Sequence, residues 1–233
     1  YLSQTTEILS IHSLEADRLR NLAQIINAKA VSDISELDQN AELNLIAVSD
    51  DQIKSVAAGL DKSIPVVHTS GSVSVDVFEG FEDAGILYPL QTFSVDRVID
   101  ISKIPFLLET NNSDFMERLK EFTSSRLSFN IFEVDSEKRS RIHIAAVFAS
   151  NFCNHLWGIS EQILEKDGIS LDLLEPLISE SIQKVMVEGS YSSQTGPAVR
   201  GDDGVINQHL SSLEGTDQEI YRLISDAIKA KFT

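Results

Sequence analysis

The stretch that decides the fold reads LNLIAVSDD and covers residues 43–51. It begins as a short apolar run of the kind that forms a buried strand, and its Ser-Asp-Asp end starts a helix over residues 52–60. A second apolar run, residues 64–68, stops at Thr-Ser-Gly-Ser, residues 69–72. Buried strands that alternate with amphipathic helices predict crossover units and a largely parallel sheet.

The same alternation continues on both sides of this stretch through the first half of the chain. Further strands are expected at residues 7–12, 85–90, 105–108 and 129–134, and further helices at 14–27 and 113–124. From Ser136 onward the apolar residues recur every three or four positions, which predicts a long helix ending at Gly168. We therefore expect an α/β domain over residues 1–135 and an all-helical domain over residues 136–233.

The composition of the 233 residues excludes several classes of protein. Hydrophobic residues make up 42% and charged residues 24%, which is typical of a folded chain and not of a disordered one. A formal net charge of −17 argues against nucleic acid and anionic membranes as partners, because both are negatively charged. The single cysteine, Cys153, excludes a disulfide framework and favours the reducing cytoplasm. No apolar run approaches the roughly 18 residues of a membrane span.

Small polar residues follow the two strands that flank residue 50. They are Val48, Ser49 and Asp50 after the first strand, and His68, Thr69, Ser70 and Gly71 after the second. In an open α/β sheet, ligands bind where the strand ends meet helix N-termini, and small residues let backbone N–H groups approach an anion or a ribose. Two helix caps and a turn use the same residue types, so the pattern also has an ordinary structural explanation.

The long helix carries a polar ridge at four-residue spacing, formed by His143, Val147, Asn151 and His155. Asn151 and His155 lie one turn apart on it among apolar residues. An amide and a neutral imidazole that face a cleft can hold a substrate carbonyl and move its proton. Two hydrogen-bonded core residues, or a dimer contact, account for the ridge equally well. Residues 144–149 are apolar all round, which predicts that this part of the helix is buried on every side.

The loop SSQTGPAVRGDDG, residues 192–204, combines a turn with one of the few basic residues of an acidic chain. Thr195 and Gly196 form the turn, and Arg200 can clamp a carboxylate or a phosphate through two parallel hydrogen bonds. A structural ion pair between Arg200 and Asp202 is an equal alternative.

Other catalytic chemistries find less support. The five histidines show neither HxxxH nor HxH spacing, so no metal site is expected. The chain has no GxSxG motif for a nucleophilic serine. A metal hydrolase is therefore the least favoured class.

Five motifs occur in a fixed order: LIAVSDD (45–51), VHTSG (67–71), YPLQTF (88–93), ASNF (149–152) and TGPAVRGD (195–202). Together they resemble the bacterial Rossmann-like proteins with a helical C-terminal domain, which are catalogued as NADP oxidoreductases without an assigned reaction. That family is similar to deazaflavin-dependent NADP reductases, pyrroline-carboxylate reductase and ketopantoate reductase. The resemblance covers nearly the whole chain. It implies a Rossmann domain, a helical domain like that of 6-phosphogluconate dehydrogenase, and a homodimer.

The chain departs from that family at two places. The family opens with a strand and a Gly-rich turn that binds the pyrophosphate, whereas this chain opens on Tyr1 and enters what resembles the family's second strand. We expect the first strand and turn to be missing from the 233 residues, because a Rossmann sheet without its first strand leaves the neighbouring strands unpaired. The alternative is that the protein has lost dinucleotide binding. Related hydroxyacid dehydrogenases carry a catalytic lysine and an asparagine one turn later, where this chain has Asn151 and His155. His155 is then the better proton donor.

The resemblance also bears on the choice of coenzyme. In a Rossmann fold the tip of the second strand contacts the adenosine ribose, and an acid there favours NAD. Here the tip consists of Ser10, His12 and Ser13, and Glu15 lies inside the following helix. A tip rich in hydroxyl groups suits a 2′-phosphate, so NADP is preferred and NAD remains an alternative.

The leading hypothesis is an NADP-dependent oxidoreductase acting on a small, acidic carbonyl or imine compound. Its expected catalytic residues are His155 and Asn151. The cofactor is expected to contact Ser10, His12, Ser13, Val48, Ser49, Asp50, His68 and Thr69. The substrate is expected to contact Ser70, Gly71, Gln91, Thr195, Gly196 and Arg200. The alternative is a non-catalytic nucleotide-sensing or scaffold protein on a Rossmann frame.

Overall fold

The fold is described from a computed structural model covering residues 2–94 and 97–232. Tyr1, where the sequence predicts a missing start, lies outside these residues. The chain divides into two compact units, Tyr1–Ala149 and Ser150–Thr233. The predicted domain boundary, after residue 135, falls where the helix α5 (Ser136–Ala146) begins. No helix in the described ranges combines the length and the apolar character needed to cross a membrane.

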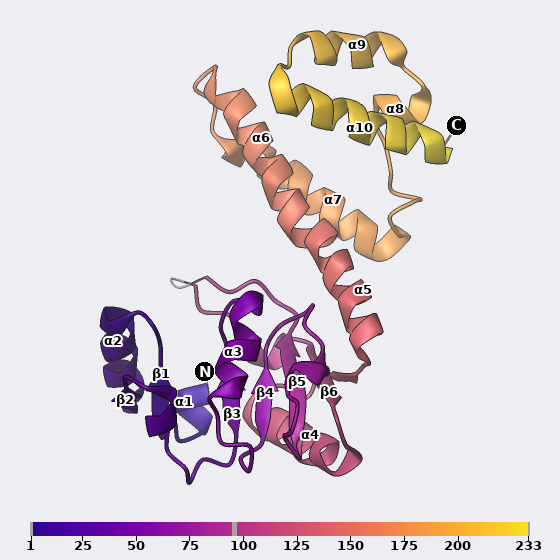
Figure 1. Ribbon diagram of the computed structural model, residues 1–233. Helices are drawn as coiled ribbons and strands as arrows, with labels where there is room; N and C mark the ends of the chain where they lie inside the picture. Colours follow the sequence, from indigo (N-terminus) through magenta and orange to yellow (C-terminus); the bar gives the residue numbers. More distant parts are fainter. Residues whose placement is uncertain (1, 95–96, 233) are drawn as a thin grey trace. The chain divides into compact units, whose positions relative to one another are not determined.

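A five-stranded sheet forms the centre of the first unit (Figure 1). Its strands, in spatial order, are β3 (Asn44–Ile46), β4 (Val66–His68), β5 (Ala84–Pro89), β6 (Phe106–Thr110) and β7 (Ile131–Glu133). All neighbours pair in parallel except β5 and β6, which are antiparallel. The α/β class with a mostly parallel sheet followed by helices is therefore confirmed.

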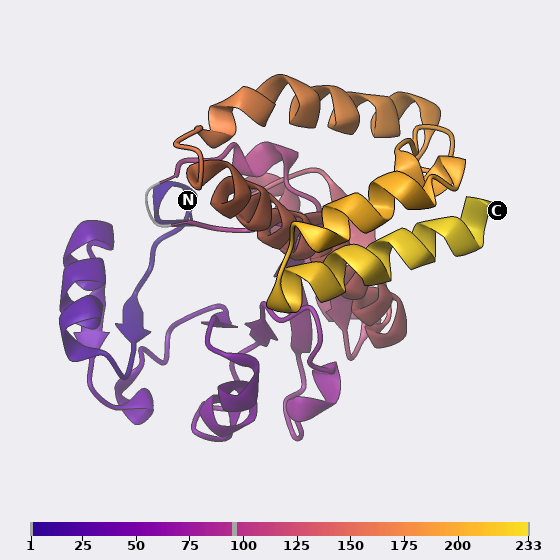
Figure 2. The same ribbon diagram turned by 90° about the horizontal axis from the view of Figure 1, so that it is seen from above.

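A second, two-stranded sheet consists of β1 (Ser10–His12) and β2 (Lys29–Val31), which are parallel. The helix α2 (Ala16–Ile26) joins them as a crossover, and Asn27 ends it in the left-handed conformation, φ 53°. Figures 1 and 2 both show this small sheet beyond β3, on the side away from β4. The strand β2 is not predicted from the sequence, because its three residues include an exposed lysine and show no apolar alternation.

Helices and short helical turns complete the first unit. Besides α2, its α-helices are α1 (Leu2–Thr5), α3 (Ile53–Ala58), α4 (Ser113–Arg126) and α5. The 3-10 turns are η1 (Ile34–Glu36), η2 (Asp50–Gln52), η3 (Val75–Val77) and η4 (Ile101–Lys103). Asn112 caps α4 by accepting a hydrogen bond from the Phe115 N–H at 2.8 Å, and Asp135 caps α5 in the same way.

The core covers both faces of the large sheet because successive strand residues point to opposite sides. On one face Val67, Leu87 and Leu108 pack against α4 through Phe115 and Leu119. On the other face the neighbouring residues of the same strands meet α3 and the loop after β4, through Ile46, Val66, Ala84, Ile53, Ala57 and Phe78. Strands buried on both faces read as continuous apolar runs, which is why they are visible in the sequence.

The second unit is helical. It contains the second half of the π-helical segment η5 (Val147–Phe152), then α6 (Cys153–Glu165), η6 (Leu171–Leu174), α7 (Glu175–Glu188), α8 (Pro197–Arg200), α9 (Asp203–Ser211) and α10 (Gly215–Phe232). The last three pack on one another and bury Ala198, Ile206 and Ser225. They are the yellow and gold helices of Figure 2.

The prediction that residues 144–149 are buried on every side was wrong for the single chain. Ile144 and Phe148 are 55% and 63% exposed. A helix that packs against its own chain along one stripe leaves its remaining surface open, whatever the residues there. The predicted long helix itself is present, as α5, η5 and α6 follow one another from Ser136 to Glu165.

Candidate functional site

The ends of β3 and β4 are joined by side chains at the carboxyl edge of the large sheet. Val48, Ser49 and Asp50 follow β3 and are all exposed, Val48 to 40%. The Ser72 hydroxyl, in the loop after β4, donates a hydrogen bond to the Asp50 carboxylate. Ser49 occupies the N-cap position of η2 without a side-chain cap, so its hydroxyl is not committed to the turn. This edge presents carboxylate and hydroxyl groups beside an exposed apolar side chain.

The turn after β4 is held by a dense set of hydrogen bonds. The Ser70 hydroxyl accepts from the N–H groups of Ser72 and Val73, each at 3.1 Å, and the Ser70 N–H donates to His68 Nδ1 at 3.1 Å. The Thr69 N–H donates to the carbonyl of Ile46 at 3.3 Å. These bonds shape the loop whether or not a ligand binds, as the structural explanation of the motif requires.

His68 is fully buried, and its ring lies 5.4 Å from that of Phe78. Burial, together with the positive charge of Arg139, lowers the pKa of His68 to about 4. The imidazole is therefore neutral at pH 7. Since Nδ1 accepts from the Ser70 N–H, the ring proton sits on Nε2. His68 thus belongs to the core behind the carboxyl edge.

A tyrosine at the end of β5 and a histidine on α5 are in contact near this edge. Tyr88, at the end of β5, and His143, on α5, share a hydrogen bond of 3.0 Å between the phenol oxygen and Nδ1. Their rings meet edge to face, with centroids 5.8 Å apart. Both side chains are half-buried, and burial raises the pKa of the Tyr88 phenol. Register places Tyr88 and His68 on one face, because His68 pairs with Ile86, two residues before Tyr88.

Gly71 leaves the space that this pair occupies. A Cβ atom built on Gly71 would lie 2.6 Å from His143 Nδ1 and 2.9 Å from Tyr88 Cζ. Both distances are far below an ordinary contact between non-bonded atoms. Close packing against the two rings therefore requires glycine here.

Arg139 fixes α5 on the sheet one turn before His143. Its guanidinium is fully buried, pairs with the carboxylate of Glu109 on β6 and donates to the Val73 carbonyl. The Ser136 hydroxyl donates to the same carboxylate at 2.8 Å. Burial lowers the pKa of Arg139 to about 10, so the group keeps its charge at neutral pH. Residues four apart share one face of a helix, so this anchor aims His143 at Tyr88.

The tip of β1 has its polar groups partly occupied. The Ser10 hydroxyl accepts from the Asp38 N–H at 2.9 Å, and the Ser13 hydroxyl accepts from the Glu15 N–H at 3.3 Å. His12 Nδ1 lies 3.2 Å from the Val31 carbonyl and donates to it in the matching tautomer, which leaves Nε2 for other contacts. These residues belong to the small sheet, so the predicted cofactor residues are divided between two sheets.

The remaining predicted residues lie on separate elements. Gln91 is exposed after β5, and its side-chain oxygen accepts from the Thr92 N–H at 2.9 Å. Asn151, in η5, and His155, in α6, are both exposed within the chain. The alternative that they are hydrogen-bonded core residues is therefore not supported.

Thr195 and Gly196 precede α8, which ends at the exposed Arg200. Within the described residues Arg200 forms no ion pair with Asp202. The Asp202 carboxylate instead caps α9 by accepting from the Val205 N–H at 3.2 Å. The structural alternative for Arg200 thus loses its partner to a helix cap.

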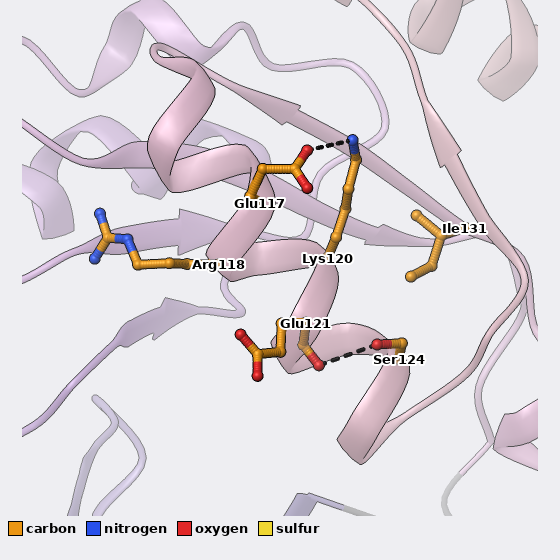
Figure 3. A pocket seen from close by; sticks show the side chains of 6 residues that line it. All are labelled: Glu117, Arg118, Lys120, Glu121, Ser124 and Ile131. Atoms are coloured by element: carbon orange, nitrogen blue, oxygen red, sulfur yellow. Dashed lines mark hydrogen bonds and ion pairs between the residues drawn. The ribbon is translucent and has the colours of Figure 1, made fainter.

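Elsewhere in the first unit, a shallow hollow lies over α4 and the start of β7 (Figure 3). Its lining residues are Glu117, Arg118, Lys120, Glu121, Ser124 and Ile131. Lys120 pairs with Glu117 at 2.9 Å, and Arg118 pairs with Asp83. Within residues 2–94 and 97–232 no group of three or more His, Cys, Asp or Glu side chains is placed to hold a metal ion.

His143 was expected on the polar ridge of the long helix, but its contact with Tyr88 and the burial of Arg139 were not predicted from the sequence. Tyr88 stands in the YPLQTF motif, and His143 lies eight residues before Asn151 on the same run of helix. A histidine and an arginine four residues apart at the start of a long helix were the available signal. Nothing in the sequence spacing, however, links residue 143 to residue 88.

Comparisons with known proteins place this arrangement in a family. The family model described as a domain of unknown function, DUF2520, matches residues 104–228, which is more than half of the chain. None of the curated proteins matches. The chain is 33% identical to a protein of Bacteroides fragilis described as a "putative NADP oxidoreductase", covering 98% of this chain and 91% of that one, with a TM-score of 0.88.

More distant structures share the fold. An imine reductase from Myxococcus stipitatus in complex with NADP+ is 16% identical, with a TM-score of 0.62 over 98% of this chain and 86% of that one. A 1-pyrroline-5-carboxylate reductase from Streptococcus pyogenes is 15% identical, with a TM-score of 0.63 over 98% and 92%. The resemblance to Rossmann-like NADP oxidoreductases and pyrroline-carboxylate reductase is confirmed.

Proposed function

This chain belongs to the family described as a domain of unknown function, DUF2520, and we propose that it is an NADP-dependent oxidoreductase. The observation that carries the proposal is the edge where β3, β4 and β5 end together, with Asp50 and Ser72 joined across it. Ligands of open α/β sheets bind at such an edge. The 33% identical relative, whose printed description names NADP, supports the choice of coenzyme.

The exposed residues of this edge fit the sugar and ring half of the dinucleotide. Asp50 and Ser49 offer acceptors to ribose hydroxyls, and the exposed Val48 side chain offers an apolar surface to a flat ring. A carboxylate repels phosphate, so Asp50 suits a sugar better than the pyrophosphate. When bound, the dinucleotide supplies the hydride that the substrate carbon accepts. For the other end of NADP we propose contacts to Ser10, His12 and Ser13.

We propose a small acidic compound with a carbonyl or imine group as substrate. Arg200 is exposed and forms no ion pair in the described part of the chain, so its guanidinium is available to a carboxylate. The amide of Asn151 and the imidazole of His155 are exposed one turn apart, and both can hydrogen-bond the group being reduced. The assignment of proton transfer to His155 stays a prediction.

We further propose that the protein forms a homodimer through its helical unit and acts in the cytoplasm. Leu173, Leu177, Met186 and Val187 are exposed in the single chain, Val187 to 85%. Apolar residues exposed in such number usually mark a protein contact. The molar mass from light scattering tests this: a value close to 25.8 kDa contradicts the dimer.

Titration of the full-length protein with NADPH and with NADH, followed by cofactor fluorescence, tests the proposed function. We expect saturable binding of NADPH. Asp50→Asn should weaken it about tenfold, because a charged hydrogen bond contributes roughly 1.5–3 kcal/mol. Asp51→Asn makes the same change of charge one residue away and should alter the dissociation constant less than about twofold.

The outcomes separate the two functions that the sequence left open. Absence of binding of both dinucleotides contradicts the oxidoreductase and the nucleotide sensor alike. Saturable binding without turnover of any imine, ketone or hydroxyacid favours the non-catalytic alternative. Equal losses in Asp50→Asn and Asp51→Asn would show that the strand-end carboxylate has no specific role.

A further inference from the structure

We propose that Tyr88 and His143 form a proton relay, in which the Tyr88 phenol protonates the group that is reduced. This inference rests on the proposed oxidoreductase function and adds to it the source of the proton. Reduction of a carbonyl or an imine needs one proton at oxygen or nitrogen for each hydride at carbon. The Tyr88–His143 hydrogen bond of 3.0 Å joins two side chains able to deliver it.

The position of the pair favours this role. Tyr88 stands at the end of β5, at the same edge as the residues after β3 and β4. Both residues are half-buried, so neither is sealed within the core. A donor held at a strand end can reach a ligand without movement of the backbone.

Three contacts hold the pair in its geometry. Arg139, buried against Glu109 and the Val73 carbonyl, fixes the helical turn before His143. Gly71 packs directly against both rings and admits no larger residue. Burying an ion pair costs desolvation free energy unless its geometry is good. The buried Arg139–Glu109 pair therefore fixes this helix on the sheet in one defined position.

The relay balances in protons and electrons. The substrate carbon receives the hydride, with its electron pair, from the reduced dinucleotide of the proposed function. As it does so, the Tyr88 O–H bond breaks and an O–H or N–H bond forms on the substrate. The tyrosinate then takes the proton from His143 Nδ1 while Nε2 takes one from a water molecule, so the imidazole stays neutral. The hydroxide left behind accounts for the one proton that the reduction consumes. The substrate is reduced by two electrons and the dinucleotide is oxidised by two.

Burial keeps the Tyr88 phenol protonated at neutral pH, because it raises the pKa of that group. The anionic tyrosinate formed in the reaction is stabilised by a hydrogen-bond donor, and His143 is within hydrogen-bond distance of it. His155, the donor expected from the sequence, is exposed and has no side-chain hydrogen bond in the described part of the chain.

The chain provides a matched control. A second pair, Tyr221 and His209, has the same geometry: Tyr221 Oη lies 2.7 Å from His209 Nδ1, and the ring centroids are 5.7 Å apart. It lies in the helical unit, and its histidine is exposed. Tyr221→Phe removes an identical hydroxyl and hydrogen bond without touching the proposed relay.

The first experiment tests the Tyr88–His143 hydrogen bond by nuclear magnetic resonance, without substrate turnover. In the free protein, the Nδ1 nitrogen resonance of His143 should move by several ppm in Tyr88→Phe and stay in place in Tyr221→Phe. The NADPH dissociation constant should remain within about twofold of wild type in both variants. An unchanged His143 resonance in Tyr88→Phe would overturn the pairing. Loss of NADPH binding in wild type would overturn the proposed function instead.

The second experiment measures turnover with NADPH and two probes, 1-pyrroline-5-carboxylate and pyruvate. Tyr88→Phe should lower kcat about 100-fold with little change in KM, since a general acid contributes roughly 10²–10⁴-fold. Tyr221→Phe should keep the wild-type kcat. His143→Ala should lower kcat about tenfold, and imidazole added to the solution should restore part of it.

Three results would contradict the relay. One is a Tyr88→Phe variant with the wild-type kcat while His155→Gln loses activity, which would assign proton transfer to His155. Another is a His143→Ala variant that imidazole fails to rescue, which would leave His143 a packing role alone. The third is a wild-type protein that binds NADPH but turns over neither probe.

Discussion

The strand-end edge of the first unit and the helical second unit hold their polar side chains in opposite ways. At the edge, Arg139 is fully buried and paired, and Tyr88 and His143 are half-buried around a glycine. In the helical unit, Arg200, Asn151 and His155 are exposed. A polar group fixed in the core costs stability unless its partners are in place, whereas an exposed one costs almost nothing. The positions of the polar side chains are therefore fixed by the fold at the strand-end edge. In the helical unit they remain available to a ligand or a partner.

Substitution of Arg139 at the edge and of Arg200 in the helical unit should give the largest difference in stability between the two regions. Arg139→Met leaves the Glu109 carboxylate without its partner, so the free energy of unfolding should fall by about 3–5 kcal/mol. Arg200→Met removes an exposed group and should change it by less than about 0.5 kcal/mol. Urea denaturation measures both. The double variant Arg139→Met/Glu109→Leu should recover part of the loss, and equal losses in the two single variants would break the contrast.

A pH-dependent loss of stability should follow from His68. Its pKa is about 4 in the folded protein and about 6.5 when exposed, so the unfolded chain binds the extra proton between these values. The contribution is complete above pH 6.5 and is lost as the pH falls towards 4, on the order of 3 kcal/mol in all. Urea denaturation at a series of pH values checks this. His68→Gln should flatten that part of the profile, and an unchanged slope would contradict the neutral, buried imidazole.

Two glycines should respond to alanine with opposite signs. In Gly71→Ala the new methyl group collides with His143 and Tyr88, which should cost about 1–3 kcal/mol and disturb the pair. In Gly158→Ala, within α6, the new methyl group has no neighbour within 4 Å among the described residues beyond the adjacent helix backbone, and the helix should gain up to about 1 kcal/mol. Thermal denaturation of both variants measures the difference. A destabilised Gly158→Ala would reveal a contact that the single chain does not show.

Most of the strands and helices could be predicted from the sequence, because their pattern is local. Strands buried on both faces, such as residues 66–68, read as apolar runs, and α4 follows an Asn-Ser start typical of a helix cap. The small strand β2 left no such trace. The antiparallel pairing of β5 and β6 also escaped prediction, because direction depends on the path of the intervening chain.

The candidate site was predicted only in part, for a related reason. The candidate residues after β3 and β4 could be predicted from the sequence, because parallel strands end at the same edge of a sheet whatever their side chains. The contact between residues 88 and 143 depends on how α5 packs on the sheet, and no local pattern encodes that packing. The ion pair suggested for Arg200 failed because Asp202 found a nearer donor in the backbone of α9.

The sequence by itself determined the class of fold, the change from alternating elements to helices near residue 136, and the acidic surface that disfavours polyanions. These properties follow from periodicity and composition, which act over a few residues or over the whole chain. Tertiary structure alone decided which polar groups are buried, which face one another and which stay free. Burial and pairing depend on atoms far apart in the chain, as with Arg139 and Val73. For this protein, that difference separates predicting the sheet edge at which we propose that a ligand binds from identifying the side chains that we propose act on it.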